Sequence, residues 1–361
     1  MKLKSFLQGF GIIAILLTLL PLIALDYWWI RVFDFPHAQL TGLTFIALAV
    51  YFIRFDVKYY KDYIFVGILL ACFIYQMVKI YEYTPLASYE VHDSTITESS
   101  NTLKIYSANV LQKNKEYQLV LDQISKKDPD IILLMETDQS WKNAVHQSLA
   151  KNYRYQMLEP LDNTYGMLFY SRLPISNQKI RHLVDKEIPS MEAVVSLPSG
   201  EQFQLYTIHP TPPMPQHNPM SSDRDTEMMK TALTVNDRKM PVIVLGDFND
   251  VTWSRTTSLF RKVSRLLDPR IGRGFHNTFN AKNILMRWPL DHIFTSEEFR
   301  VKSFDHTDGI NSDHFPLYTE LTLEPNKAKD QLPTKPTESE LKSARDQMDK
   351  QNLLNIDMPN M

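Results

Sequence analysis

Residues 242–250 read VIVLGDFND, an apolar run that ends in Gly246, Asp247, Phe248 and Asn249. The β-branched, apolar composition predicts a buried strand. Gly246 allows an unusual backbone or a close approach, and Asp247 and Asn249, two residues apart, leave the strand end on the same side. An ionised aspartate can accept a proton from water, and an amide can donate to an oxygen on which negative charge develops. The alternative is a plain strand-to-turn junction, since Gly, Asp and Asn dominate turns.

Three other apolar runs end in a polar side chain in the same way. LKIYSAN ends at Asn109, IILLME at Glu136 and QFQLYTIH at His209. A carboxylate at Glu136 suits Mg²⁺, which prefers oxygen ligands, keeps several waters and takes one or two carboxylates. Asn109 could orient Glu136 or a metal-bound water. Each of these residues has a bland alternative as an exposed strand end, so the prediction depends on their occurring together.

Two further motifs place acids beside histidines. WPLDHIFTS contains Asp291, and SDHFPL contains Asp313 and His314 just before an apolar strand. Adjacent residues on an extended segment point to opposite sides, so one can reach a metal or water while the other addresses a phosphate. Asp291 is a natural partner for an imidazole, since a carboxylate on one ring nitrogen fixes the tautomer and favours the charged form. Acids, amides and histidines converging from several strands are what metal-assisted phosphoester cleavage requires.

Hydrophobicity is concentrated in residues 1–83, which contain three apolar stretches, Phe6–Leu25, Ala38–Ile53 and Tyr63–Met77. The first is long enough to cross a bilayer, and the other two reach spanning length with their interfacial flanks. A cleaved signal peptide is the alternative for the first stretch. Its apolar core is longer than a typical signal core, however, and no small-x-small cleavage site follows it. The sequence therefore predicts a three-span transmembrane anchor over residues 1–83.

The basic residues around these stretches predict an orientation. The loop between the first and second stretches has only Arg31, with Tyr27, Trp28 and Trp29 as part of an outer aromatic belt completed by Tyr81 and Tyr83. Basic residues accumulate on the cytoplasmic side of membrane proteins. Five basic residues lie before the first stretch or between the second and third stretches, which places them on one side of the membrane: Lys2, Lys4, Arg54, Lys58 and Lys61. We therefore expect a multi-pass protein of the cell (inner) membrane whose C-terminal domain is extracytoplasmic.

The rest of the chain divides into three parts by composition. Residues 84–102 are polar and rich in Ser and Thr, which predicts a linker holding the domain off the membrane. Residues 103–323 alternate strands with interspersed helices and lack a strict βαβ order, which favours an α+β domain of two packed sheets flanked by helices. Residues 324–361 lose apolar periodicity and are predicted to form a polar, disordered tail. Within the tail, Thr337 to Glu340 has the form of a capping box and could start a short helix.

All the motifs stand in a fixed order within residues 103–323: Asn109, Glu136, His209, Gly246-Asp247-Phe248-Asn249, Asp291 and Ser312-Asp313-His314. This ordered set resembles the endonuclease/exonuclease/phosphatase superfamily, also called the DNase I-like fold, over about residues 103–323. The segment GMLFYSRLPI resembles the same family's apolar strand that ends in a Tyr-Ser-basic turn. The resemblance implies a four-layered α/β sandwich and a divalent metal, usually Mg²⁺, with Mn²⁺ as the alternative.

The resemblance also implies roles. Glu136 would be the main metal ligand, with Asn109 and Asp313 near the metal. Asp247 would activate or orient the attacking water, and Asn249 would stabilise the developing charge. Three further residues would contact the scissile phosphate or protonate the leaving group: His314 paired with Asp291, and His209.

The substrate is less determined than the chemistry. An N-terminal anchor of three spans resembles the VanJ-like branch, which is associated with teicoplanin resistance and linked to lipid-pyrophosphate hydrolysis. Tethering raises the effective concentration of lipid substrates, whereas free DNA gains little from it. The expectation is thus a Mg-dependent phosphohydrolase whose partners are the bilayer and a lipid-linked phosphate, with no protein partner. Two alternatives remain, an anchored nuclease acting on extracytoplasmic DNA or RNA and a catalytically dead binding module.

One segment has a strong charge bias. From residue 255 to residue 287, between GDFN and LDH, a single acid, Asp268, opposes eight basic residues: Arg255, Arg261, Lys262, Arg265, Arg270, Arg273, Lys282 and Arg287. Such a segment could face anionic headgroups or a pyrophosphate. The alternative is a solvated helix face.

Overall fold

Two β-sheets packed face to face form the centre of the larger of two parts in this computed structural model, which describes residues 2–23, 26–97, 99–214 and 219–357, with side chains through residue 349. The first sheet has six strands in the order β10-β11-β1-β2-β4-β3, and the second has five in the order β5-β6-β7-β8-β9. The strands of the first sheet are β1 (Thr102–Asn109), β2 (Ile131–Met135), β3 (Tyr155–Glu159), β4 (Met167–Ser171), β10 (Phe299–His306) and β11 (Leu317–Leu323). Those of the second are β5 (Ile175–Arg181), β6 (Ser190–Ser196), β7 (Gln202–Ile208), β8 (Val242–Asp247) and β9 (Asp291–Thr295).

Each sheet is built around one parallel pair of strands. β1 runs parallel to β2, and β7 runs parallel to β8, while the other neighbours are antiparallel. Parallel strands end at the same sheet edge, and an antiparallel neighbour begins there. The carboxyl ends of β1, β2, β7 and β8 and the starts of β9 and β11 therefore gather along one edge of the two-sheet sandwich.

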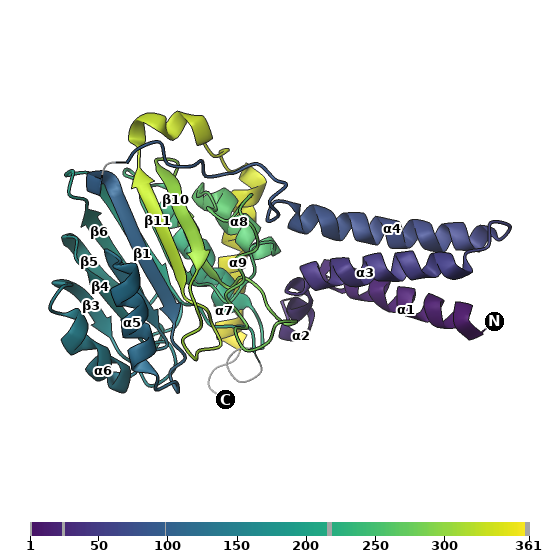
Figure 1. Ribbon diagram of the computed structural model, residues 1–361, viewed down its shortest axis with the longest axis horizontal. Helices are drawn as coiled ribbons and strands as arrows, with labels where there is room; N and C mark the ends of the chain where they lie inside the picture. The colour runs from purple at the N-terminus through teal and green to yellow at the C-terminus, as the bar shows by residue number, and fades with distance from the viewer. Residues whose placement is uncertain (1, 24–25, 98, 215–218, 358–361) are drawn as a thin grey trace.

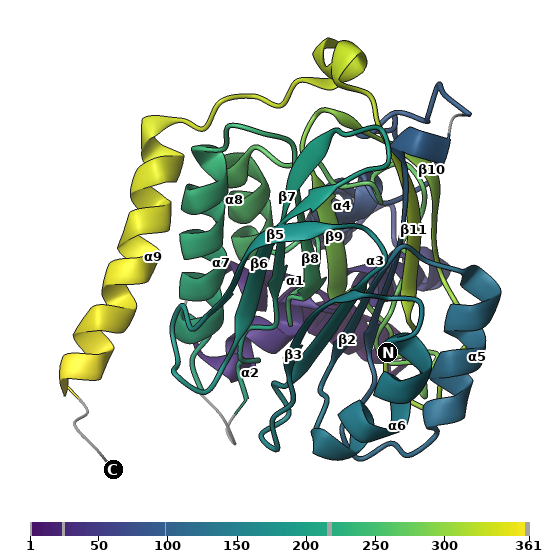
Figure 2. The same cartoon turned by 90° about the vertical axis from the view of Figure 1, so that its left-hand side faces the viewer.

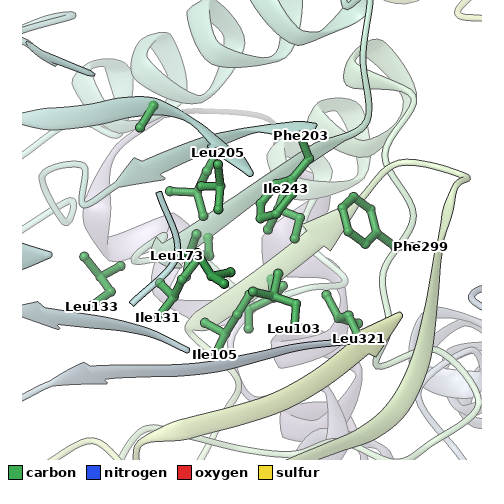
Figure 3. Close-up of a cluster of buried hydrophobic side chains, with 14 of the residues drawn as sticks. Leu103, Ile105, Ile131, Leu133, Leu173, Phe203, Leu205, Ile243, Phe299 and Leu321 are labelled. Atoms are coloured by element: carbon green, nitrogen blue, oxygen red, sulfur yellow. The ribbon is translucent and has the colours of Figure 1, made fainter. Parts of the chain in front are cut away.

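The core between the sheets is continuous and apolar (Figure 3). Leu103 and Ile105 of β1 point into it beside Ile131 and Leu133 of β2, and Leu205 of β7 faces them from the second sheet. Intervening residues of β1 and β2 face outward and are also buried, against helices. Strands covered on both faces require apolar residues at almost every position, which explains why these motifs read as unbroken apolar runs.

Helices cover the outer face of each sheet (Figure 2). On the first sheet lie α5 (Tyr117–Lys127) and α6 (Gln139–Leu149), and on the second lie α7 (Ser222–Asn236) and α8 (Arg255–Ser264). α9 (Glu338–Asp357) packs on the outside of α7 and α8. Two of these helices begin at a side-chain cap, where Asp138 accepts from Trp141 N–H at 2.8 Å and Ser254 accepts from Thr257 N–H at 2.9 Å. The predicted α+β fold with four layers is confirmed.

The tail differs from its prediction of disorder. A short 3-10 helix, η5 (Pro325–Gln331), leads to α9, whose Ala344 is buried with Leu341 and Met348 against α7 and α8. The capping box is formed as its sequence suggests, since Glu340 N–H donates to the Thr337 hydroxyl at 3.2 Å and Thr337 N–H donates back to Glu340 at 2.8 Å. Apolar residues spaced three to four apart suffice for packing even though the segment is polar on average.

The predicted linker also differs from a free spacer. Residues 84–97, which we call the strap, lie along the larger part and end near η4 (Ser99–Asn101). Val91 enters the inter-sheet core, Ser94 N–H donates to Val301 O at 2.8 Å, and Glu90 pairs with Arg261 at 2.7 Å. The hydroxyls of Ser94 and Thr95 both donate to the Glu324 carboxylate of the domain, so the polarity of these residues does not mean solvation.

The N-terminal part is a slender helical bundle that projects from one side of the domain (Figure 1). It contains α1 (Lys2–Leu19) continued by η1 (Leu20–Leu22), α2 (Trp28–Arg31) with η2 (Val32–Asp34), α3 (His37–Tyr51) with η3 (Phe52–Arg54), and α4 (Tyr60–Tyr81). Two helices, Lys2–Leu22 and Tyr60–Tyr81, are long and apolar enough to cross a membrane. A third span of the predicted three exists only if the pair formed by Trp28–Asp34 and His37–Arg54, bent by 71°, counts as one.

The bundle has apolar side chains outside and polar ones inside. Phe6 is 70% exposed and Val78 is 68% exposed, whereas Thr18, Thr44 and Gln76 are buried and meet between the helices. That distribution is the one expected of helices whose outer surface contacts lipid.

The bundle joins the domain through a small apolar core. Ile80 and Tyr83 pack with Trp253, Ile271 and Trp288 of the domain. Tyr83 is therefore not part of an outer aromatic belt, contrary to the prediction. It is buried, and its hydroxyl donates to Thr252 O at 3.0 Å, which satisfies the polar end of the ring.

Candidate active site

The polar residues predicted from strand ends meet at the sheet edge described above. Asn109 is the last residue of β1, Glu136 follows β2, His209 follows β7, Asp247 ends β8, and Asp291 opens β9. Asp247 and Asp291 are direct register partners across the antiparallel β8–β9 pair. The arrangement follows from strand direction, because every one of these positions lies at the same edge.

Gly246 makes the close approach of β8 to β7 possible. It pairs with Ile208 across the two parallel strands and has φ +145°. A Cβ at this position would collide with the carbonyl oxygen of Ile208. Only glycine fits, and its presence places Asp247 one residue later against the start of β9.

His314 lies between two carboxylates. Its Nδ1 is 2.8 Å from Asp291 Oδ2, and its Nε2 is 3.6 Å from Asp247 Oδ2. Burial alone would lower the pKa of His314, but the charges of Asp291 and Asp247 outweigh burial and raise that pKa to about 10. The ring is therefore an imidazolium. Its Nδ1 proton is hydrogen-bonded to Asp291, whereas its Nε2 lies too far from Asp247 for a normal hydrogen bond.

Asn109 links the two sheets. Its Nδ2 donates to Glu136 Oε1 at 2.8 Å and to Asp247 Oδ2 at 3.0 Å, and its Oδ1 accepts from Leu111 N–H at 3.1 Å. The amide thus orients one carboxylate from each sheet. Burial raises the pKa of Asp247, with the Asp291 carboxylate adding to it, against the opposing effects of His314, His209 and Asn109.

Glu136 stands in an uncommon backbone conformation. Its φ is +58°, which non-glycine residues adopt rarely and which turns its side chain away from the line of β2. Strain of this kind collects at functional sites because the surroundings must hold it. Nearby, Gly166 approaches so closely that a Cβ there would collide with the carbonyl oxygen of Thr137, the residue after Glu136.

His209 and Asn249 complete the cluster from the second sheet. His209 is buried, its Nε2 lies 3.9 Å from Asp247 Oδ2, and its ring packs 5.3 Å from that of Tyr165. Asn249 N–H donates to Asp247 Oδ1 at 2.9 Å, and its side-chain amide donates to Pro210 O at 3.0 Å. These contacts hold both residues beside the carboxylate of Asp247.

Asp313 is the predicted residue least joined to the others. It is half-buried, and within the described residues its hydrogen bonds run to Ser312 at 3.4 Å and, through its carbonyl, to Ala281 N–H at 2.7 Å. The pKa of His314 is lowered by burial and raised most by Asp291 and Asp247; the charge of Asp313 raises it by a smaller amount. Asp313 therefore borders the cluster on the His314 side.

Three residues that sequence reasoning gave no role support the site. The Ser312 hydroxyl donates to Asn109 O at 2.8 Å and accepts from His314 N–H at 3.1 Å, which ties the His314 loop to the end of β1. The Thr278 hydroxyl accepts from Asp291 N–H at 3.2 Å. Burial raises the pKa of Tyr165 to about 12, so its hydroxyl stays protonated beside His209. Ser312 stands inside a quoted motif, but no sequence signal marks Thr278 or Tyr165.

Two groups of side chains could hold a cation. One ligand atom each of Asp247, Asp291 and His314 lie within 4.8 Å of one another. Both ring nitrogens of His314 already face carboxylates, however, and a protonated imidazole is not a metal ligand. Glu136 is half-buried, and its carboxylate keeps lone pairs beside the bonds it accepts from Asn109 Nδ2 at 2.8 Å and from Gln112 N–H at 3.4 Å, which fits a hard cation that keeps several waters. Asp313, also half-buried, lies on the His314 side. The donor set on the Glu136 side is the better fit for a divalent metal.

A family profile described as Endonuclease/Exonuclease/phosphatase family matches residues 100–314. The chain belongs to this family. Family members are phosphoester hydrolases. No curated protein sequence matches the chain.

Solved structures share the fold at low sequence identity. An endonuclease/exonuclease/phosphatase from Beutenbergia cavernae superimposes with a TM-score of 0.50 at 16% identity, covering 62% of this chain and 72% of that one. A family protein from Bacteroides thetaiotaomicron superimposes with a TM-score of 0.50 at 17% identity, covering 62% and 98%. One from Bacteroides vulgatus has a TM-score of 0.50 at 16% identity, covering 62% and 99%. These similarities concern the fold.

Proposed function

We propose that the chain is a membrane-anchored, divalent-metal-dependent phosphohydrolase of the VanJ-like kind. It would cleave a phosphoester or pyrophosphate bond of a lipid-linked substrate at the outer face of the membrane. The observation that carries the proposal is the attachment of the active-site rim to the residues that join the candidate membrane spans.

Two rim loops make that attachment. The loop that follows His209 meets the segment before α2, where Trp28 N–H donates to Pro219 O at 2.8 Å and Ser221 N–H donates to Asp26 O at 2.8 Å. The loop that precedes Asp291 meets the first turn of α3, where the Gln39 side chain donates to Leu285 O at 3.0 Å. A site whose rim is bonded to span ends stands at the surface of the bilayer, where a lipid headgroup is accessible and a long nucleic acid is not favoured.

The chemistry assigned to the side chains follows from their positions. Asp247, with a pKa raised by burial, is placed to take a proton from an attacking water. The imidazolium of His314 can give its Nε2 proton to a phosphoryl or leaving oxygen while Asp291 holds Nδ1. His209 and Asn249, both fixed beside Asp247, can donate to non-bridging phosphoryl oxygens. Mg²⁺ or Mn²⁺ bound by Glu136 and Asp313, with Asn109 orienting Glu136, would neutralise charge on the transferred phosphoryl group.

The basic segment supports a small anionic target better than a nucleic acid. Arg261 pairs with Glu90 at 2.7 Å, Arg270 is buried and donates to Asp291 O at 2.7 Å, and Arg273 pairs with Asp93 at 2.6 Å. These guanidinium groups hold the fold together, so they do not form the solvated basic surface that binds a phosphate backbone. Arg255 and Lys79 of α4 instead line a cavity of about 350 Å³ at the junction with the bundle, which also contains Asp34 and the ion pair of Lys262 with Glu340 at 3.0 Å.

The orientation is part of the proposal. With the N-terminus in the cytoplasm, the ends of α1 and α4 that meet the domain lie at the outer face. A reporter enzyme fused after Tyr83 would be active only outside the cytoplasm. Activity of the reporter only in the cytoplasm would reverse the orientation and contradict the outer-face assignment.

The decisive experiment measures phosphate release by the full-length protein in detergent or nanodiscs, with Mg²⁺ and a polyprenyl pyrophosphate. A plasmid-nicking assay runs in parallel, with Asp247→Asn as the inactive variant and Asp122→Asn, an exposed acid on α5, as the matched control. Release that needs metal and Asp247, with intact plasmid, supports the proposal. Nicking without phosphate release would assign the chain to the anchored nucleases. If neither assay shows activity, the proposed substrate is wrong and only membership of the family stands.

A further inference from the structure

The three most exposed large apolar side chains in the described part of the molecule are Ile284 at 81%, Leu86 at 79% and Leu285 at 75%. Met286, 51% exposed, continues the run. All exceed or approach the exposure of the outward side chains of the bundle, such as Phe6 at 70%. Three consecutive apolar residues at a loop tip are costly in water and mark a contact surface.

The loop tip at residues 284–286 and the strap at Leu86 are both hydrogen-bonded to the ends of bundle helices. The Gln39 side chain, in the first turn of α3, donates to Leu285 O at 3.0 Å and to Arg287 O at 3.2 Å. The Tyr81 hydroxyl, at the end of α4, donates to Leu86 O at 3.2 Å. These helix ends face the domain (Figure 1), so the exposed tip lies at the level where the bundle's apolar surface begins.

The same loop reaches the catalytic cluster. Ala281 N–H donates to Asp313 O at 2.7 Å, and the Phe279 ring lies 5.0 Å from the ring of His314. Phe279 is in turn held by Trp288, whose carbonyl accepts from Phe279 N–H at 2.9 Å. Residues 279–288 therefore run from the helix end at Gln39 to the His314 loop without an intervening element.

We propose that Ile284, Leu285 and Met286 insert into the outer leaflet of the lipid bilayer, and that this contact holds residues 279–288 in the position that aligns His314 with a lipid-borne substrate. The partner is the bilayer, because the tip continues the lipid-facing surface of the bundle and is bonded to it. Insertion rests on the anchor alone. The effect on turnover rests in addition on the proposed phosphohydrolase function.

Insertion is tested by fluorescence in nanodiscs of phosphatidylethanolamine and phosphatidylglycerol. A polarity-sensitive dye is attached to Leu285→Cys in a Cys72→Ser background, with nitroxide-labelled lipids as quenchers. The matched control is Leu119→Cys, an exposed apolar position on α5, which lies away from the bundle. The proposal expects a blue-shifted dye quenched by the lipids at residue 285 and an unquenched, water-like dye at residue 119. Equal, water-like signals at both positions would overturn it.

The alignment is tested by activity. The triple serine variant Ile284→Ser, Leu285→Ser, Met286→Ser should lose about tenfold of its turnover on a bilayer-embedded lipid pyrophosphate and keep its turnover on a water-soluble short-chain pyrophosphate. Leu119→Ser should retain both activities. Equal losses on the two substrates would show that the loop supports the site only structurally and would overturn the alignment. If the wild type hydrolyses neither substrate, the proposed function fails, and the fluorescence result still decides insertion.

Discussion

Two buried carboxylates, one in the bundle and one in the catalytic cluster, are equally hidden and differently partnered. Asp62 of α4 is 0% exposed, and both its oxygens are occupied, Oδ1 by the Tyr51 hydroxyl at 2.9 Å and Oδ2 by Lys4 at 2.5 Å. Asp291 is 1% exposed, and its Oδ2 binds His314. Its Oδ1 is buried and has no hydrogen-bond partner among the described residues.

The difference distinguishes a buried carboxylate that stabilises the fold, such as Asp62, from one that can still accept a ligand, such as Asp291. A buried carboxylate whose lone pairs are all filled ties helices together and gains nothing from a ligand. A buried carboxylate with an open oxygen is left incomplete, as is the nearby His209, whose Nδ1 is buried without a partner in the described part of the chain. Natural proteins carry few such groups, and each calls for an explanation. The following predictions test whether partner count distinguishes the two regions.

The largest effect is expected at Asp247. Asp247→Asn keeps the shape of the side chain and removes its ability to accept a proton, so phosphate release should fall by about 10³–10⁴-fold. The thermal stability of the variant should match or exceed that of the wild type, because the pKa of Asp247 is raised by its burial. Rate and melting temperature are measured on the same preparation. A variant that melts early and loses activity in proportion would place Asp247 with Asp62 as a structural residue.

Glu227 of α7 adds a third kind of buried carboxyl, one kept neutral. Burial raises its pKa to about 8, so the folded protein holds a proton that the unfolded chain releases above its ordinary pKa near 4.3. The contribution of Glu227 to stability should therefore be fully present below about pH 4, fall as the pH rises towards 8, and then level off.

Glu227→Gln removes that pH dependence. The variant should be more stable than the wild type by up to roughly 5 kcal/mol above pH 8, and the two should converge near pH 4. Melting temperatures of both proteins at pH 4, 6 and 8 give the comparison. Parallel curves with a constant offset would mean that Glu227 is charged in the folded protein.

An intermediate effect is expected from Asp291→Asn. The amide can still meet His314 Nδ1, but it no longer favours the imidazolium, so activity should fall by about 10²-fold with little change in folding. His314→Gln provides the second measurement. If the hydrogen-bonded pair acts as a unit, the double variant should be no slower than the slower single variant. Multiplying losses would contradict the pairing.

The smallest effect on activity belongs to Asp62. Asp62→Ala leaves the Tyr51 hydroxyl without its acceptor and Lys4 without its ion-pair partner, and should cost about 2 kcal/mol of stability. Phosphate release per folded molecule should stay within about twofold of the wild type, because the loss concerns helix association alone. Thermal unfolding in detergent and active-site titration separate the two quantities. A loss of turnover without a loss of stability would instead couple the far end of the bundle to the site.

The strand-borne part of the site can be predicted from sequence because strand periodicity and direction determine where such residues project. Asn109, Glu136, His209 and Asp247 each end an apolar run, and parallel neighbours bring such ends together. The loop-borne part cannot be predicted in this way. Thr278 acts through a hydroxyl that caps the start of β9, and no period or motif announces a contact between residues 13 apart in sequence.

Segments judged by average composition were the least predictable. The strap looks like a spacer because its serines, threonines and acids are polar, yet the side chains of Glu90 and Ser94 use that polarity to bond Arg261 and Glu324 of the domain. α9 looks disordered because charges dominate it, yet Ala344 alone, at the right spacing from its neighbours, is fully buried against α7 and α8. Composition reports the mean of a segment, and packing depends on which face carries the few apolar residues.

The strap has one more consequence. The strap's bonds to Arg261 and Val301 attach the segment between α4 and β1 to the domain. The sheet edge that carries the candidate site is therefore held at a fixed distance from the bundle and at a fixed angle to it. Under the proposed function, an enzyme held in this way would meet its lipid-linked substrate by lateral diffusion in the bilayer. Its rate should therefore follow the mole fraction of substrate among the lipids, and diluting the same vesicles into a larger volume of buffer should leave that rate unchanged.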